Sequence, residues 1–198
     1  MRRTQLEEKT MNTSFAKVGA SILAATVALS APALAQNTMV GGAEMLPTNN
    51  IVENAVNSAD HTTLVAAVQA AGLAETLSGP GPFTVFAPTN AAFEKLPDGT
   101  VEGLLEPESL EALQTILTCH VVPTEAFSTA VGNMIQQGGG SAALETVGSC
   151  TLTASIRASD NALQITDENG NAATVLIPDV DQSNGVIHVI DTVLLPAA

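Results

Sequence analysis

The first half of the chain places apolar residues at helical spacing. Residues 62–72 are predicted as a helix, because their apolar side chains fall on one face, Thr62 can cap the first turn and Gly72 can end the last one. A short helix is predicted for residues 51–57. A further helix opens at Pro107, with an apolar stripe formed by Leu110, Leu113, Ile116 and Leu117.

From residue 119 onward the pattern favours strands. Residues 119–123 (CHVVP) are predicted as a short strand that Pro123 stops, and a helix capped by Ser128 follows to about residue 137. Apolar and polar residues alternate in 151–159, as in a half-buried strand. Asn169-Gly170 predicts a hairpin turn, and residues 185–196 form the longest strand. Helices gathered early and strands late predict an α+β fold.

The stretch 83–97 (FTVFAPTNAAFEKLP) changes abruptly from a buried strand to an amphipathic helix. Pro88 lacks an N–H and is expected to end the strand. Thr89 is the natural N-cap of the helix, and Phe93, four residues later, can pack back towards Pro88 as a hydrophobic staple. The junction needs no nucleophile, base or phosphate-binding loop, so we interpret it as scaffold.

Residues 1–35 are predicted to be a secretory signal peptide. After Met11, an alternative translation start, come a lone Lys17, an apolar run and the small residues Ala33-Leu34-Ala35, with cleavage expected before Gln36. The alternative is that the apolar run forms a first core helix. We favour the signal peptide, because the run is rich in Ala and stops at small residues.

The mature chain is expected to begin with a polar, flexible lead-in at residues 36–49, followed by one domain at 50–196. No Cys follows the apolar run of the leader, so no lipid anchor is predicted. No later segment approaches the roughly 18 apolar residues that a spanning helix needs. We therefore expect a periplasmic or secreted protein without a membrane span.

Removal of the leader leaves an acidic chain. Its only basic side chains are Lys95 and Arg157, against eighteen acidic ones, and its formal net charge is −16. Two cations cannot neutralise a nucleic-acid backbone, and the same charge balance argues against anionic membranes as partners. We interpret the acidity as a solubilising surface, with an acidic site for cationic partners as the alternative.

Two cysteines, Cys119 and Cys150, remain after the leader. An even number of cysteines in an exported chain favours a disulfide, which would close a loop of roughly thirty residues. The alternative is a reactive thiol beside His120. That chemistry needs a lowered pKa and a third, orienting group, and the sequence shows neither.

Other candidate chemistry is weak. No short metal-ligand spacing connects the three histidines, His61, His120 and His188. Asp167, Asn169 and Asn171 match the first ligand positions of a calcium loop. Ala172 and Pro178, however, stand where such a loop requires Gly and Glu, so a hairpin tip is the better interpretation. There is no G-x-S-x-G sequence and no phosphate-binding loop. We predict neither an enzyme, nor a metal site, nor a cofactor.

Three segments, FTVFAPTNAAFEKLP, CHVVP and SNGVIHVIDTVLLP, resemble in order and spacing the signature segments of the fasciclin (FAS1) domain. The resemblance covers residues 50–196. It implies a wedge-shaped β-sandwich with helices packed around its N-terminal half. The family commonly has Tyr-His where this chain has Cys119-His120, so any partner contact that depends on the tyrosine is in doubt here.

By the same resemblance the signature residues are expected to be structural: Thr89, Asn90, Phe93, His120 and His188. A binding role is implied for Asp179 and Val180, which match an Asp-Ile pair linked to integrin-mediated adhesion in animal members of the family. The alternative is a turn between two strands in which Asp179 is solvated. A signal peptide of bacterial type makes integrin an improbable partner.

The sequence thus predicts a non-catalytic adhesion or cell-surface interaction protein with an extracellular partner of unknown identity. The alternative is a carrier of a small apolar ligand, a pigment or lipid, which some fasciclin-domain proteins resemble. The aromatic content of the mature chain argues against a carrier function. The mature chain has four Phe and neither Trp nor Tyr, whereas ligand pockets are usually lined by aromatic residues.

Overall fold

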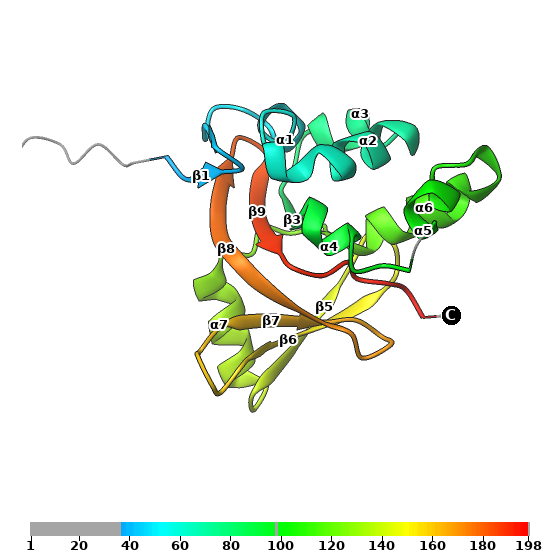
Figure 1. Ribbon diagram of the computed structural model, residues 1–198. Helices are drawn as coiled ribbons and strands as arrows, with labels where there is room; N and C mark the ends of the chain where they lie inside the picture. Colours follow the sequence, from blue (N-terminus) through cyan, green and yellow to red (C-terminus); the bar gives the residue numbers. More distant parts are fainter. Residues whose placement is uncertain (1–36, 98, 198) are drawn as a thin grey trace, which may run out of the picture. The chain divides into compact units, whose positions relative to one another are not determined.

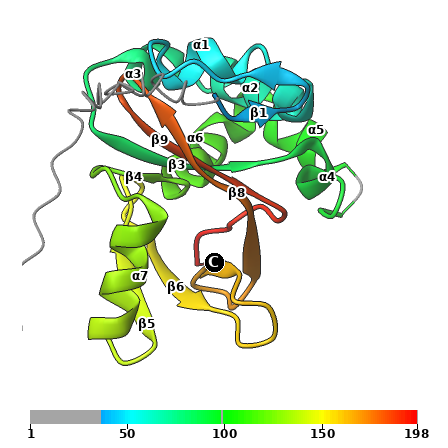
Figure 2. The same ribbon diagram turned by 90° about the vertical axis from the view of Figure 1, so that its left-hand side faces the viewer.

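The computed structural model describes residues 37–97 and 99–197. The predicted signal peptide lies outside the described residues. Seven strands form one sheet, shown in Figures 1 and 2, in the order β4-β3-β9-β8-β7-β6-β5. Their bounds are β3 Phe83–Pro88, β4 Val121–Val122, β5 Ser141–Glu145, β6 Thr151–Ile156, β7 Leu163–Thr166, β8 Ala172–Gln182 and β9 Gly185–Ile190. The neighbours β3 and β9 are parallel, and the other pairs are antiparallel.

The helices come mainly before the strands of the sheet, as predicted for an α+β fold, and that prediction is confirmed. The helix α7 (Ser128–Gln137) follows β4 and packs against β5 and β6. The earlier helices gather on the other side of β3 and β9 (Figure 1). They are α1 Ile51–Ala55, η1 Ala59–His61, α2 Thr62–Ala70, α3 Ala74–Ser78, α4 Asn90–Phe93, α5 Thr100–Leu104, η2 Pro107–Ser109 and α6 Leu110–Cys119.

Two apolar clusters share the central strands, because side chains alternate across a strand. On β3, Val85 and Ala87 point into the cluster under the helices α1, α2 and α6, whereas Phe86 points into the cluster under α7. The strand β8 contributes to both, with Val175 in the second cluster and Val180 in the first. Two register shifts between β8 and β9 accompany this change of side.

The ends of the helices show which local predictions hold. Asn50 caps α1 through a capping box with Glu53. Gly72, with φ +70°, ends α2 as predicted: its N–H donates to the Gln69 carbonyl, and the next N–H donates to the Val68 carbonyl.

Two predicted N-caps need correction. Thr62 and Ser128 are each the first residue of their helix, and neither helix is capped by its own flanking side chain. Instead, Asn90 Oδ1 accepts the backbone N–H of Thr63, and Asp179 Oδ1 accepts that of Ser128. Both caps come from elsewhere in the chain, 27 and 51 residues away.

Three further expectations differ from the structure. The strand predicted for residues 185–196 ends at Ile190, and β8, with 11 residues, is longer than β9, with 6. Residues 37–49, expected to be flexible, form the hairpin β1 (Met39–Val40) and β2 (Ala43–Glu44), and bury Val40 and Met45 in the first cluster. Buried Asn54 ties this segment to the helical layer, since its side chain donates to and accepts from the backbone of Leu46. The predicted strand 119–123 is shorter than expected, because Cys119 ends α6 and only Val121–Val122 pair with β3.

Cys119 and Cys150 form a disulfide with a Cα–Cα distance of 5.4 Å. Both residues are buried, at 1% and 5% exposure, so the alternative of an accessible reactive thiol is not supported. The bridge joins the end of α6 to the turn before β6. It thereby links the helical layer to the strands that pack under α7.

Candidate functional site

The predicted binding residue Asp179 lies at an irregular point of β8, with φ +58°. Its carboxylate holds the start of α7: Oδ1 accepts the Ser128 N–H at 2.6 Å, and Oδ2 accepts the Ser128 hydroxyl. A carboxylate at a helix N-terminus is favourable, because the first N–H groups are unpaired and the helix dipole is positive there. Asp179 is therefore an acceptor built into the fold as well as a half-exposed acid.

Behind Asp179 lies His188, which is fully buried in β9. Its Nδ1 accepts the Asp179 N–H at 3.3 Å, so the ring proton belongs on Nε2, which lies 2.8 Å from the Ala126 carbonyl oxygen and donates to it. The ring stacks on Phe86, with 5.6 Å between centroids. Burial lowers the pKa of His188, so the neutral ring expected from these hydrogen bonds is also the favoured charge state.

Thr84 completes the same network from β3. Its hydroxyl donates to the Thr124 carbonyl at 2.6 Å and accepts the Ala126 N–H at 2.8 Å. Together with His188, it fixes the connection between β4 and α7. The start of α7 is thus positioned from three strands: β3, β8 and β9.

An open cleft of about 350 Å³ lies beside this network. Its lining includes Leu163 and Val175, which are nearly buried, and Ile156 and Pro178 at the exposed rim. Val180, the other predicted binding residue, is only 1% exposed and packs in the first cluster. A direct partner contact by Val180 is therefore not available in this conformation, whereas Pro178, two residues earlier, faces solvent.

His120 follows α6 and connects it to the segment after β9. Its Nε2 accepts the Leu194 N–H at 2.9 Å, and the protonated Nδ1 donates to the Ile116 carbonyl, 2.8 Å away. The His120 carbonyl accepts the Phe86 N–H at 2.9 Å. Burial lowers the pKa of His120 to about 4, so the side chain is neutral at neutral pH.

The signature residues after β3 also make structural contacts. The Thr89 hydroxyl accepts the Ala92 N–H at 3.3 Å, as predicted for an N-cap, although α4 spans only Asn90–Phe93. Asn90 does more than the sequence suggested: besides capping α2 at Thr63, its Nδ2 donates to the Ala59 carbonyl at 2.9 Å. Phe93 packs, partly buried, against the first cluster.

The match to the family model for the fasciclin domain covers residues 59–196. The chain belongs to the fasciclin family. Protein sll1483 of Synechocystis sp. is 50% identical over 146 residues, 74% of this chain and 73% of that protein. Immunogenic protein MPB70 of Mycobacterium bovis is 35% identical over an alignment of 205 residues, 94% of this chain and 95% of the relative.

The fold is also that of a solved structure. A FAS1 domain pair from the insect cell adhesion molecule fasciclin I matches with a TM-score of 0.52 and 24% identity, over 65% of this chain and 42% of that chain. The predicted FAS1 fold is thereby confirmed. The fasciclin family is a family of non-catalytic adhesion and surface proteins, which confirms the prediction that this protein is not an enzyme.

The residues of the candidate calcium loop serve the fold of this fasciclin domain. Asp167, the start of the supposed calcium loop, is buried and uses its oxygens locally: Oδ1 accepts the N–H groups of Asn169 and Asn171, and Oδ2 accepts that of Leu195. Among the described residues, no cluster of three or more His, Cys, Asp or Glu could hold a metal ion. No helix in that part of the chain is long and apolar enough to cross a membrane.

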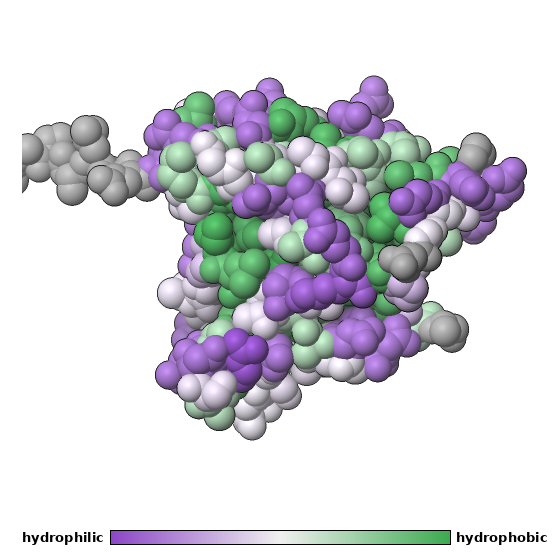
Figure 3. Space-filling model, viewed as in Figure 1, coloured by the Kyte–Doolittle hydropathy of each residue, from purple (hydrophilic) through white to green (hydrophobic). Residues whose placement is uncertain are grey.

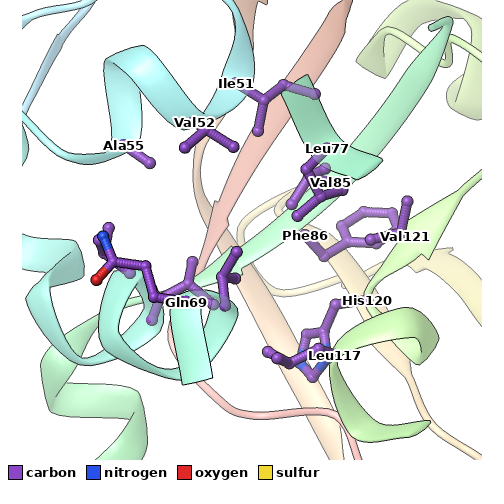
Figure 4. Close-up of a pocket in the computed structure, with 13 residues that line it drawn as sticks. Ile51, Val52, Ala55, Gln69, Leu77, Val85, Phe86, Leu117, His120 and Val121 are labelled. Atoms are coloured by element: carbon purple, nitrogen blue, oxygen red, sulfur yellow. The ribbon is translucent and has the colours of Figure 1, made fainter. Parts of the chain in front are cut away.

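A second hollow lies between the helices and β3 (Figure 4). It is a narrow apolar cavity, partly open to solvent, of about 40 Å³, lined from α1, α2, α3, α6 and β3 by residues that include Val52, Val68, Leu77, Val85 and Leu117. His120 borders it, but both ring nitrogens of His120 already have partners. The cavity offers apolar contact and little else.

Hydrophilic side chains cover much of the surface seen in Figure 3, and an apolar zone lies over the middle of β8, where Leu176 is 53% exposed. Lys95 and Arg157 are each paired, with Asp191 at 3.4 Å and with Asp160 at 2.6 Å. Because both of these cations are paired, most of the acidic side chains in residues 37–97 and 99–197 have no basic counterpart within that part of the chain.

Replacing Asp179 is expected to destabilise the domain, because the start of α7 loses a negative charge and the acceptor of the Ser128 hydroxyl. Asp179→Asn keeps a residue that tolerates a positive φ but removes the charge, and should lower the free energy of unfolding by about 1 kcal/mol. The measurement is urea denaturation followed by circular dichroism. Asp181→Asn, an exposed acid two residues away, is the matched control, and equal stability of the two variants would contradict the capping role.

His120 is expected to make the domain less stable in acid. The unfolded side chain has a pKa near 6.5 and the folded one about 4, so as the pH falls from about 6.5 to 4 the unfolded state binds more protons. This contributes a loss of about 3 kcal/mol, and the lowered pKa values of His61 and His188 act in the same direction.

Denaturation curves between pH 7.5 and 4 check the effect of His120. His120→Gln should be less stable at neutral pH, because it loses well-placed hydrogen bonds, and should show a shallower loss of stability on acidification. An unchanged pH slope in the variant would show that His120 is not the group responsible.

Proposed function

We propose that the protein is an exported, non-catalytic fasciclin-domain protein that mediates adhesion or binds a protein at the cell surface or outside the cell. Two observations support export: the predicted signal peptide and the buried disulfide, which fits an oxidising compartment such as the periplasm or the medium. Membership of a family of adhesion and surface proteins supports the functional class.

The cleft beside Asp179 is the binding surface in this proposal, and it is the observation on which the proposal mainly rests. Protein interfaces often rely on a few apolar anchors that enter pockets, surrounded by a polar rim. Leu163 and Val175 provide an apolar floor here, and the rim residues Ile156 and Pro178 are exposed. We propose that an apolar side chain of the partner enters this cleft.

Asp179 then acts as a positioning residue. It anchors α7 through Ser128, which itself lines the cleft, and its position at a bulge of β8 sets the place of Pro178. The predicted importance of Asp179 for binding is thus retained, with an indirect mechanism. Val180 contributes through packing beneath the surface.

The charge of the mature chain restricts the partner. With a formal net charge of −16, the domain favours partners with a neutral or basic rim, and it repels acidic ones over distances of about a Debye length. Binding to a partner with a basic rim is therefore expected to weaken as salt is raised, mainly through a slower association.

Substitution at the cleft rim tests the proposed surface. The labelled mature protein is applied to intact cells and to envelope fractions of its own host, and bound label is measured against protein concentration. Ile156→Glu should weaken binding by about tenfold or more, as expected for the loss of an apolar anchor worth about 1.4 kcal/mol. Ile156 is 42% exposed, so its replacement should leave the fold intact.

Val56→Glu is the matched control, since Val56 is 50% exposed and follows α1, on the helical side of the sheet. Equal binding by the two variants would place the interaction elsewhere. Absence of saturable binding by the unmodified protein, at both low and high salt, would end the adhesion proposal.

A second candidate function, a carrier of a small apolar ligand, is favoured only by the cavity between the helices and β3 (Figure 4). Its volume of about 40 Å³ is far below the roughly 300–1,000 Å³ of typical ligand pockets. A pigment or lipid could enter only if α1 and α2 moved away from β3. The adhesion proposal therefore ranks first.

Native mass spectrometry of protein purified from the export fraction of its host, with an absorbance scan, separates the two functions. The adhesion proposal predicts the mass of the bare mature chain with its disulfide and no visible absorbance. Excess mass that is lost on denaturation would put the carrier function first. In that case Val68→Phe, which fills the cavity, should reduce the bound fraction.

A further inference from the structure

The chain contains two Asn-Gly pairs, and the fold places them in different surroundings. Asn169-Gly170 lies in the turn between β7 and β8, and Asn184-Gly185 lies between β8 and β9. Asn-Gly is the dipeptide at which an Asn side chain is most easily attacked by the following backbone nitrogen, because Gly has no Cβ to hinder the approach. The surroundings decide which of the two pairs can react.

At the first pair the attacking and the attacked groups both lie at the surface, where the Asn169 amide also donates to the carbonyls of Leu195 and Pro196. Asn169 and Gly170 are exposed, and nothing lies within 4 Å of the point where a Cβ of Gly170 would be. The Gly170 N–H makes a single turn hydrogen bond, to the Asp167 carbonyl at 3.1 Å. The reaction requires this bond and the two exposed bonds of the Asn169 amide to open, which costs little because turns at the surface open readily.

At the second pair both groups are held. Asn184 Oδ1 accepts the Ile51 N–H at 3.0 Å, and Nδ2 donates to the carbonyls of Leu77 and Gly79 at 2.8 and 2.9 Å. Gly185 is buried between β3 and β8, where a Cβ would lie 2.0 Å from the Phe83 carbonyl oxygen. The rotation that brings the Gly185 nitrogen to the Asn184 side chain would require these strands to separate.

We propose that Asn169 is a site of spontaneous deamidation in the folded protein, and that Asn184 is protected. The Gly170 backbone nitrogen attacks the side-chain carbonyl carbon of Asn169, a new C–N bond forms, and the side-chain nitrogen leaves as ammonia with the proton from the Gly170 N–H. Water then opens the cyclic imide at one of its two carbonyls. The products are aspartate, or isoaspartate with an extra backbone atom in the turn.

The modification would act on the segment 192–197, because three consecutive hairpin residues hold it. Asp167 accepts the Leu195 N–H at 2.9 Å, and Glu168 accepts the Ala197 N–H at 3.1 Å. Asn169 instead donates, from Nδ2 to the carbonyls of Leu195 and Pro196 at 3.1 and 2.8 Å.

A carboxylate at position 169 has no proton to donate and would face two carbonyl oxygens. It would also stand beside Asp167 and Glu168, which adds like-charge repulsion. The contacts of Leu195 and Pro196 with the hairpin would therefore weaken. The same segment carries the Leu194 N–H that bonds His120, so the loosening would reach the link between α6 and the sheet.

Incubation of the folded, full-length protein at mildly alkaline pH tests the proposal, with peptide mass mapping of both Asn-Gly pairs over time. Asn169 should convert at least about tenfold faster than Asn184, a barrier difference of about 1.4 kcal/mol. In urea-unfolded protein the two pairs should convert at similar rates, which shows that the fold causes the difference. Equal rates in the folded protein, or no conversion of Asn169 while the unfolded chain reacts, would overturn the proposal.

Two variants test separately the deamidation of Asn169 and the loosening of the segment 192–197 that it is expected to cause. Asn169→Gln keeps a side-chain NH₂ group but reacts much more slowly, so its modification should disappear from the map. Asn169→Asp has the product's charge from the start and should expose the backbone N–H of Leu195 to faster hydrogen exchange. Exchange at Leu195 identical to that of the unmodified protein would contradict the proposed loosening.

Discussion

The polar side chains of Thr84 on β3 and His188 on β9 have no access to solvent, and each therefore requires a hydrogen-bond partner inside the protein. Every residue of β9 is buried, and Thr84 and His188 sit on neighbouring parallel strands at 0% exposure. Their partners are backbone groups of the β4–α7 connection and of the β8 bulge. The need to satisfy two buried side chains thus fixes a loop, the start of a helix and the irregular strand that borders the proposed binding cleft. His120 plays the equivalent part between α6 and the segment after β9.

Features that depend on neighbouring residues were predictable from the sequence. Apolar spacing identified α2, and the end of that helix at Gly72 follows from the freedom of glycine to adopt a positive φ. Alternation identified β6, and the opposite directions of Val85 and Phe86 follow from the period of a strand. The fasciclin signatures added the arrangement of these pieces, because they occur in the family's order.

What the sequence could not show depends on residues far apart in the chain. Thr62 and Ser128 have the right chemistry for helix caps, yet Asn90 and Asp179 take that role from 27 and 51 residues away. A remote cap leaves no local pattern, since any polar residue brought close by the fold can serve. The same holds for the hairpin at residues 39–44, whose short strands have no periodicity to detect and which is held by buried Val40 and Met45. The cleft beside Pro178 was missed for this reason: β6, β7, β8 and α7 each contribute to it.

Adhesion is favoured by helices that stay packed on the sheet, whereas ligand carriage requires those helices to move away from it. A binding surface benefits from rigid support, because ordering on binding costs free energy. The cavity of about 40 Å³, in contrast, is too small for a pigment or lipid unless the short helices separate from β3. Asn184 resists such a separation. From the β8–β9 turn it holds the first N–H of α1 and the Leu77 carbonyl of α3 at once, and Gln114 of α6 holds the Ala71 carbonyl at the end of α2. Opening the cavity would break several of these contacts together. The hydrogen bonds that protect Asn184 from modification thus also favour a fasciclin domain that binds with its surface and keeps its interior closed.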